Sequence, residues 1–357
     1  MKYLNLLIFP ALLALTVSAN AAQPLFESEE VLAITIEAPM RELIRNRANK
    51  PEFDAVVRYT DSSGEEHYLD ARISPRGNAR LATCDFPPIR LEFDESTTAG
   101  TAFENQKRLK MVTRCSSGRS AKEWLLVEQG IYQAYNEITD FSYRVRALDV
   151  TFRDLKSSRW RLQMPAFFIE STGEVADRHG RKSIRPPEIK TGQFQNKETT
   201  NYVLLQYLIA NTDFALKRGP SGEGCCHNGR VLTEPGRQDN WIVLPYDFDQ
   251  AGIINTDYAL PDRRFSIKRV TSRLYRGFCW QNDSLPDAIA AFNDKREIIT
   301  ARLSPAELSS SKRKRVERFI NGFYEIVNDP EELQKRLTDK CRGAATFAVR
   351  KTSTAGQ

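Results

Sequence analysis

The spacing of apolar residues changes between the two halves of the chain, and this change restricts the folds that the sequence can form. Before residue 171, apolar and polar residues alternate in short segments, a pattern typical of strands with one buried face. Asp61-Ser62-Ser63-Gly64 separates the first two segments and predicts a hairpin. The strand-like segments are 53–59, 67–73, 89–93, 109–112, 147–152 and 164–170. We therefore expect a mixed or antiparallel sheet in the first half.

Helical spacing dominates the second half. One helix is expected earlier, from Lys122 to Ile138, where it would pack on the sheet. The polar stretch 171–195 is the best candidate for a boundary. The later helical segments are 202–210, 285–294, 312–327 and 330–340. These patterns predict an α+β fold with a sheet-bearing N-terminal lobe at 23–170, a mostly helical C-terminal lobe at 171–345 and a disordered tail at 346–357. A single-domain α+β fold is the alternative.

The first residues have the pattern of a secretory signal peptide. Lys2 precedes an apolar run from Leu4 to Val17, and small residues follow it at 18–22. The run is shorter than the roughly 20 residues that a membrane-spanning helix needs. We therefore predict a signal peptide at 1–21, a periplasmic or secreted location and no stable membrane insertion.

Six cysteines in an exported chain favour disulfides over free thiols. Cys84 and Cys115 lie near neighbouring strand-like segments, so we expect them to pair. The adjacent Cys225 and Cys226 are expected to pair with the remaining two cysteines, Cys279 and Cys341, because direct pairing of neighbours strains the peptide. Zinc is the competing interpretation, but the chain has no C-x-x-C motif and three histidines.

The positive charge does not indicate a nucleic-acid partner. The formal net charge of +6 is small for 357 residues, and part of it lies in Lys312-Arg313-Lys314-Arg315. Apolar residues follow this run at helical spacing, so we interpret it as the solvated face of a helix.

Oxygen-bearing side chains gather at the ends of apolar segments in the second half. Asp213 follows a predicted helix, and Asp247 and Asp249 follow the apolar strand 241–244. Buried carboxylates need a cation, hydrogen bonds or water. Together with the amide of Asn228, they form a set suited to Mg²⁺ or Mn²⁺. The alternative is that the aspartates of Asp-Phe-Asp satisfy backbone N–H groups in a turn.

Several short motifs in this region resemble those of the spore-coat CotH-like family of atypical, secreted protein kinases. The matching residues in the second half are Asn211-Thr212-Asp213, His227-Asn228 before a Val231-Leu232 strand, and Leu244 to Asp249. In the first half, Ile73 to Arg80, with Arg76-Gly77-Asn78, and Pro87 to Phe93 resemble the family's first strand pair. The resemblance extends from about Ile73 to about Tyr324 and implies a two-lobed, protein-kinase-like fold.

The resemblance also implies a role for each matching residue. Asp213 would be the base-like aspartate near the acceptor hydroxyl, and Asn228 and Asp247 would bind the metal. Asp249 would be an added metal ligand or would support one. Phosphoryl transfer needs metal ions and cations to neutralise charge and a carboxylate to orient the attacking hydroxyl.

Three further residues would contact or position the phosphates of ATP. Lys110 on a strand and Glu128 on the following helix would form an ion pair, and Arg76 would bind phosphate through its guanidinium. Chance spacing is the alternative for Lys110 and Glu128, and a buried structural role is the alternative for Arg76. His227, the histidine near these aspartates in the sequence, is interpreted as a structural, hydrogen-bonded histidine beside a disulfide rather than as a general base or ligand.

Two departures from the kinase pattern bear on activity. The segment Lys217 to Cys226 lengthens the interval between Asp213 and Asn228, and the chain has no G-x-G-x-x-G loop. The leading hypothesis is a Mg²⁺- or Mn²⁺-dependent, ATP-using phosphotransferase acting on an exported protein or an envelope hydroxyl. The alternative is a catalytically inactive kinase-like protein for envelope binding or assembly, with the inserted loop filling the cleft. A metal-dependent phosphoester hydrolase is the third hypothesis.

Overall fold

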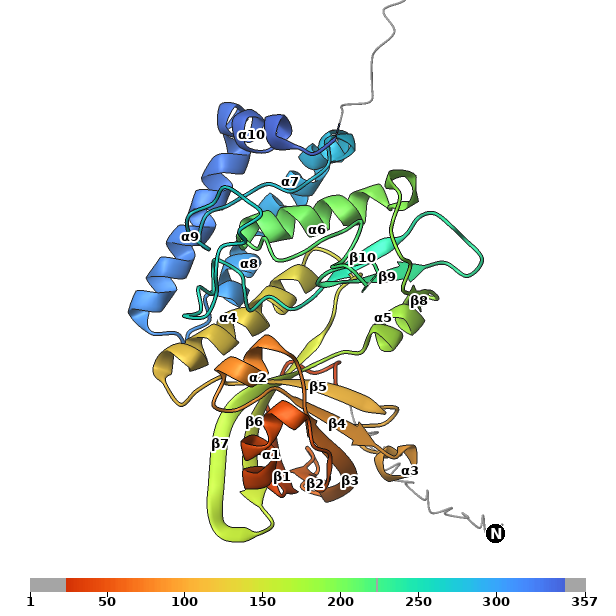
Figure 1. The fold of residues 1–357 in the computed structure, drawn as a ribbon, viewed down its shortest axis with the longest axis vertical. Coiled ribbons are helices and arrows are strands. Elements are labelled where there is room, and N and C mark those ends of the chain that lie inside the picture. The colour runs from red at the N-terminus through yellow and green to blue at the C-terminus, as the bar shows by residue number, and fades with distance from the viewer. Residues whose placement is uncertain (1–23, 223, 344–357) are drawn as a thin grey trace, which may run out of the picture.

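In the computed structural model, which describes residues 24–222 and 224–343, seven strands of the first half close into a mixed β-barrel (Figure 1). The order around the barrel is β1-β2-β3-β4-β5-β7-β6, and a parallel pairing of β1 with β6 closes it. The strands are β1 (Leu32–Ala38), β2 (Phe53–Thr60), β3 (Glu66–Pro75), β4 (Ile89–Phe93), β5 (Arg108–Thr113), β6 (Val145–Asp154) and β7 (Ser157–Ile169). The fold is therefore α+β, as predicted.

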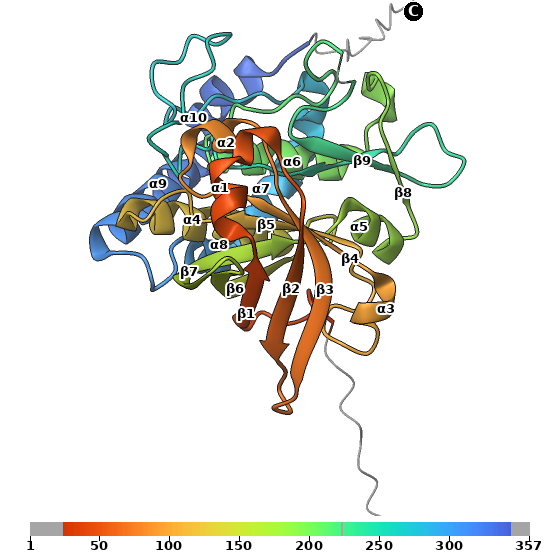
Figure 2. The same cartoon turned by 60° about the horizontal axis from the view of Figure 1, so that its bottom comes forward.

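The sequence pattern identifies the antiparallel neighbours within the barrel but not its closure. The predicted hairpin is confirmed: β2 pairs antiparallel with β3, and Asp61 Oδ1 accepts hydrogen bonds from the backbone N–H groups of Ser63 and Glu65 at 2.8 and 3.0 Å. A sheet with one buried face was expected, whereas the closed barrel encloses its apolar faces in a core of its own. Figure 2 shows β1, β2 and β3 from the side on which they curve around this core.

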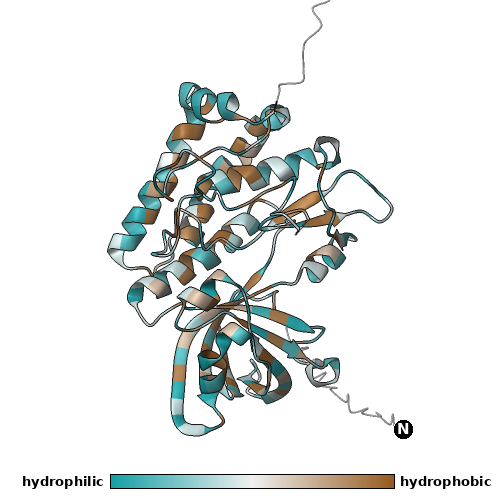
Figure 3. Ribbon diagram, in the orientation of Figure 1, coloured by the Kyte–Doolittle hydropathy of each residue, from teal (hydrophilic) through white to brown (hydrophobic). Residues whose placement is uncertain are grey.

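A second apolar core lies among the helices and extends to the barrel. It takes side chains from the ends of three barrel strands, through Val112, Val145 and Phe167, and from the large helices. The principal helices are α4 (Arg119–Asn136), α6 (Asn196–Leu208), α7 (Leu285–Asp294), α8 (Arg296–Leu303), α9 (Ser310–Asn328) and α10 (Pro330–Arg336). The buried apolar residues of α9 recur at helical spacing, and Figure 3 shows apolar segments in brown between polar ones in teal along this helix. The helical segments predicted beyond residue 195 are thus confirmed, and α8 is added to them.

The helix α4 packs between the barrel and the other helices. It contacts the barrel, as expected, through the rings of Tyr132 and Phe167, whose centroids are 5.9 Å apart. On another side it lies directly against α8, because a Cβ atom added at Gly130 would lie 2.2 Å from the carbonyl oxygen of Arg302. The helix predicted at 122–138 therefore packs on α8 as well as on the barrel.

The polar stretch 171–195 has more regular structure than a linker. It contains α5 (Thr172–Arg178), whose first turn is closed by a capping box between Ser171 and Glu174. It also contains β8 (Lys182–Ile184), the edge of a small sheet in the order β10-β9-β8. The other two strands are β9 (Gly229–Thr233) and β10 (Ile242–Pro245). Asn228 directly precedes β9, and Asp247 and Asp249 follow β10, so this second sheet positions the predicted metal ligands.

Short elements complete the described chain. The remaining α-helices are α1 (Met40–Arg45), α2 (Ala79–Thr83) and α3 (Glu95–Thr98). The 3₁₀-helices are η1 (Arg47–Asn49), η2 (Thr191–Gln193), η3 (Cys279–Ser284) and η4 (Thr338–Lys340). The predicted signal peptide, 1–21, and the predicted tail, 346–357, lie outside the described residues. Among the residues described, no helix combines the length and the apolar character needed to cross a membrane.

The six cysteines form three disulfides. Cys84 pairs with Cys115, as predicted. The prediction that Cys225 and Cys226 reach Cys279 and Cys341 is wrong. Cys279 pairs with Cys341, because a parallel bridge between the neighbouring residues 278 and 342 places their Cα atoms 4.8 Å apart. Cys225 pairs with Cys226, across a cis peptide bond. Three disulfides are consistent with an oxidising compartment.

Candidate functional site

A cleft of about 640 Å³ opens where the barrel meets the helices and the small sheet. Its walls come from the segment after β3, from β5, α4 and β7, and from the loops that follow α6 and β10. All seven residues that the sequence analysis singled out line this one cleft: Arg76, Lys110, Glu128, Asp213, Asn228, Asp247 and Asp249. Residues that are up to 173 positions apart in the chain are thus brought to one site.

Asp213 is held by its neighbours on both sides. The bridge between Ala215 and His227 places the segment before β9 beside the segment after α6. His227 Nε2 lies 2.8 Å from Asp213 Oδ1, and Asn228 Nδ2 donates to Asp213 Oδ2 at 3.0 Å and to the Asp213 carbonyl oxygen at 2.7 Å. Arg276 also holds this segment, because it donates to the carbonyl oxygens of Thr212 and Phe214. The carboxylate therefore has a defined orientation in the cleft.

Asp247 lies where β10 ends, in the left-handed region of backbone conformation, with φ of 64°. Its N–H donates to the hydroxyl of Tyr132 on α4 at 3.0 Å. Its carboxylate faces the open cleft, but protein atoms crowd it on the other sides. This crowding and the neighbouring Asp249 raise the pKa of Asp247, and Arg80 and Arg76 oppose the change. Among the described residues its carboxylate accepts no hydrogen bond, so it is available to a cation.

Asp249 and Glu128 have a partner that the sequence analysis did not predict. Arg80, from α2, donates to Glu128 at 2.6 Å and to Asp249 Oδ2 at 3.0 Å. Asp249 Oδ2 also lies 3.4 Å from the hydroxyl of Tyr258. The expected ion pair between Lys110 and Glu128 does not form, because Arg80 already occupies the buried carboxylate of Glu128.

Arg76 and Lys110 consequently lie in the cleft without a carboxylate partner. Within the described part of the chain, neither forms an ion pair closer than 4.0 Å. Burial, Arg76 and Arg230 lower the pKa of Lys110 to about 8, and burial lowers the pKa of Arg76. Lys110 Nζ and the Arg230 guanidinium both lie near the ring of Tyr246, at 5.8 and 4.3 Å from its centroid. This end of the cleft is suited to an anion.

The inserted segment Lys217 to Cys226 does not fill the cleft. None of its described residues lines the cleft. It is held instead against 186–189, since Cys225 N–H donates to the Pro186 carbonyl oxygen at 2.8 Å and Ile189 N–H donates to the Lys217 carbonyl oxygen at 2.9 Å. On the barrel side, Gly77 in the segment after β3 lines the cleft, with φ of +89°. The cleft therefore remains open despite the insertion.

The residues of the cleft fit a divalent cation in part. Asp247, with a carboxylate free of hydrogen bonds, and the amide oxygen of Asn228 are suitable ligands for Mg²⁺ or Mn²⁺. Asp249 is engaged by Arg80 and fits the role of a supporting group better than that of a ligand. In the described residues, the one group of three His, Cys, Asp or Glu ligands within 4.8 Å lies elsewhere, at Asp61, Glu65 and His67 on the hairpin.

One residue of the site, Arg80, was missed as a functional candidate. Arg80 belongs to the motif that begins at Arg76, but the sequence analysis gave it no role. The signal that could have identified it is a second arginine four residues after Arg76 in the same motif. His227 was interpreted as structural, and its contact with Asp213 follows from its position next to Asn228.

No protein-family model matches the chain, and no curated protein matches its sequence. The CotH-like resemblance therefore stays a proposal.

Proposed function

We propose that the protein is an exported, CotH-like phosphotransferase that uses Mg²⁺ or Mn²⁺ and ATP. One observation carries the proposal: two cations without carboxylate partners, Arg76 and Lys110, line the same cleft as the oriented Asp213 and the available Asp247. Transfer of a phosphoryl group needs both kinds of residue, cations for the phosphates and a carboxylate for the acceptor. In this proposal the barrel and the helical part are the two lobes of a kinase-like fold.

Each side chain then has a specific task. Arg76 and Lys110 neutralise phosphate oxygens, and Arg76 can do so with two parallel N–H groups. Asp213 accepts a hydrogen bond from the acceptor hydroxyl and orients it, while His227 and Asn228 hold the carboxylate in place. Asp247 and Asn228 would hold the metal ion, which supplies charge neutralisation between phosphate oxygens when bound.

The acceptor in this proposal is a hydroxyl group of an exported protein or of an envelope component. The predicted signal peptide and the three disulfides support a role outside the cytoplasm. The open cleft supports access by a side chain or a sugar hydroxyl, because no described residue of the inserted segment covers it.

The first test is calorimetric titration of the oxidised mature protein with Mn²⁺, alone and with ATP. We expect nucleotide binding that requires Mn²⁺ and is lost in Asp247→Asn. The matched control is Asp61→Asn, which removes the hairpin group as an alternative source of heat and should leave Mn²⁺-dependent ATP binding intact. Absence of Mn²⁺-dependent ATP binding in the wild-type protein would overturn the proposal.

A second candidate function is that of an inactive kinase-like protein for envelope binding or assembly. The observation that favours it is the engagement of the acidic side chains: Arg80 holds Glu128 and Asp249, and Asp213 accepts bonds through both of its carboxylate oxygens. This candidate predicts no heat with Mn²⁺ in the Asp61→Asn variant. The open cleft speaks against its simplest form, in which the inserted loop fills the site.

A further inference from the structure

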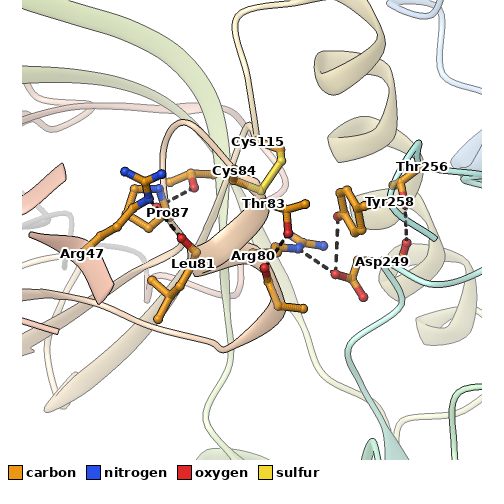
Figure 4. The surroundings of a disulfide bond; sticks show 12 residues. Arg47, Arg80, Leu81, Thr83, Cys84, Pro87, Cys115, Asp249, Thr256 and Tyr258 are labelled. Atoms are coloured by element: carbon orange, nitrogen blue, oxygen red, sulfur yellow. Dashed lines mark hydrogen bonds and ion pairs between the residues drawn. A yellow bond between two sulfur atoms is a disulfide. The ribbon is translucent and has the colours of Figure 1, made fainter. Parts of the chain in front are cut away.

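Arg80 forms the most deeply buried ion pairs that border the cleft. Its side chain is 11% exposed, and those of its partners Glu128 and Asp249 are 5% and 9% exposed. The guanidinium contacts the two carboxylates through different nitrogens, Nη2 and Nε, and so connects α2 with α4 and with the segment after β10. Figure 4 shows Arg80 reaching toward Asp249 and Tyr258. Breaking such a pair leaves a buried charge without a partner.

The helix that carries Arg80 has five residues and depends on contacts beyond its own hydrogen bonds. Its last turn ends at Cys84, whose N–H donates to the Arg80 carbonyl oxygen at 3.0 Å. The disulfide to Cys115 ties this end to the chain just after β5, and Asp85 N–H donates to the Cys115 carbonyl oxygen at 2.9 Å. Arg47 Nε adds a bond to the carbonyl oxygen of Leu81 at 3.0 Å (Figure 4).

The same disulfide connects the segments that carry three of the cations lining the cleft, Arg76, Arg80 and Lys110. Cys84 closes the segment that carries Arg76 and Arg80, and Cys115 follows the strand that carries Lys110. Arg76 is additionally anchored by its N–H, which donates to the Pro88 carbonyl oxygen at 2.8 Å. Movement of α2 would therefore change the position of Arg80 relative to Lys110 and to the acidic side chains.

Removal of Arg80 would leave its two carboxylates, Glu128 and Asp249, buried without a cation. Arg76 and Lys110 line the same cleft and have no carboxylate partner of their own. If Arg76 and Lys110 paired with those carboxylates, they would bind an anionic ligand more weakly, since one cation cannot neutralise a carboxylate and a ligand at full strength. The presence of Arg80 thus explains why Arg76 and Lys110 remain available.

We propose that Arg80 is a positioning residue: by pairing with Glu128 and Asp249 it keeps Arg76 and Lys110 free to bind a phosphate-bearing ligand, and the Cys84–Cys115 disulfide holds it in place. The ligand class rests on the proposed function, whereas the pairing that keeps the cations free does not. Phosphate affinity of the cleft therefore depends on Arg80 and on the oxidised state of this one disulfide.

Inorganic tripolyphosphate without metal is the probe, because it reports on the cations alone. We expect Arg80→Met to weaken tripolyphosphate binding by about tenfold or more, as Arg76 and Lys110 turn to the released carboxylates. The double variant with Glu128→Gln should recover part of the affinity, since one of the two competing charges is then absent. Because Glu128→Gln also removes a buried unpaired charge, thermal melting of Arg80→Met must show that this variant is folded at the temperature of the titration, and that result separates the positioning role from a purely structural one. Equal affinity of Arg80→Met and the wild-type protein would overturn the proposal.

The disulfide is tested by replacing its two cysteines with serine in one variant. The matched control replaces Cys279 and Cys341, whose disulfide lies outside the cleft lining. We expect the Cys84/Cys115 variant to lose tripolyphosphate affinity by about tenfold, and the Cys279/Cys341 variant to keep it. Thermal melting of both variants shows whether each is folded at the temperature of the titration. Equal loss in both folded variants would overturn the role of this disulfide.

If the wild-type protein binds tripolyphosphate but not Mn²⁺ with ATP, the phosphotransferase proposal fails and the positioning role of Arg80 stands.

Discussion

His227 Nε2 lies 2.8 Å from the Oδ1 atom of Asp213, and Asn228 donates to the other carboxylate oxygen from the next position in the chain. Two consecutive residues therefore hold one carboxylate from both sides. Asn228 itself adopts the left-handed backbone conformation, with φ of 50°. The pair acts on the residue that the proposed mechanism assigns to the acceptor hydroxyl.

Replacement of His227 tests whether this contact matters for transfer. We expect His227→Leu to lower the rate of phosphoryl transfer by about 10- to 100-fold, because the carboxylate loses one of its two anchors and the acceptor its orientation. His227→Gln keeps a hydrogen-bond donor and should lose less. Affinity for Mn²⁺ with ATP should remain within about twofold in both variants, since neither phosphate contact changes. Equal activity of the leucine and glutamine variants would contradict an orienting role.

Lys110 gives the proposed nucleotide site a pH dependence. Burial and two arginines lower its pKa to about 8, so it is largely protonated at pH 7 and largely neutral at pH 9. Because a neutral amine does not attract phosphate, the Kd for Mn²⁺ with ATP should rise by roughly tenfold between these pH values. Lys110→Arg keeps its charge throughout this range and should show a nearly constant Kd. The same slope in both proteins would assign the titration to another group.

Metal binding should be lost on acidification at a higher pH than for an ordinary aspartate. Crowding by protein atoms and the neighbouring Asp249 raise the pKa of Asp247, so its carboxylate takes up a proton above the usual 3.8. Protons and Mn²⁺ then compete for the same oxygens, and Mn²⁺ affinity falls as the pH is lowered through this raised value. The control is Asp257→Asn, an exposed aspartate outside the cleft lining, which should leave the pH profile unchanged. A wild-type profile that stays flat down to pH 4 would exclude Asp247 as a ligand.

Local patterns predict the elements of this fold better than their closure. The alternation in β2 and β3 and the turn at Asp61 identify a hairpin, because the neighbouring strands interact across only a few residues. Closure of the barrel depends on the parallel pairing of Ile34 with Val150, residues more than a hundred positions apart. No local spacing reports on such a contact, so the barrel was read as an open sheet.

In the candidate site, too, residues in short motifs could be predicted from the sequence, whereas contacts between distant segments could not. Asp213, Asn228 and Asp247 each lie at the end of a helix or next to a strand, where short motifs can be recognised, and the structure brings them together. The partner of Glu128 could not be predicted. Arg80 lies on a five-residue helix whose position depends on a disulfide and on contacts across the cleft.

The close contact between α4 and α8 gives a prediction about stability. A Cβ atom at Gly130 would lie 2.2 Å from the Arg302 carbonyl oxygen, which is backbone and cannot rotate away. Gly130→Ala should therefore force the two helices apart and lower the free energy of unfolding by about 1–3 kcal/mol, although alanine has the higher helix propensity. The matched control is Gly192→Ala in η2, where a Cβ atom meets nothing within 4 Å, so the free energy of unfolding should change by less than about 1 kcal/mol. Chemical denaturation of both variants measures the difference, and equal stabilities would show that α8 does not press on α4 at this position.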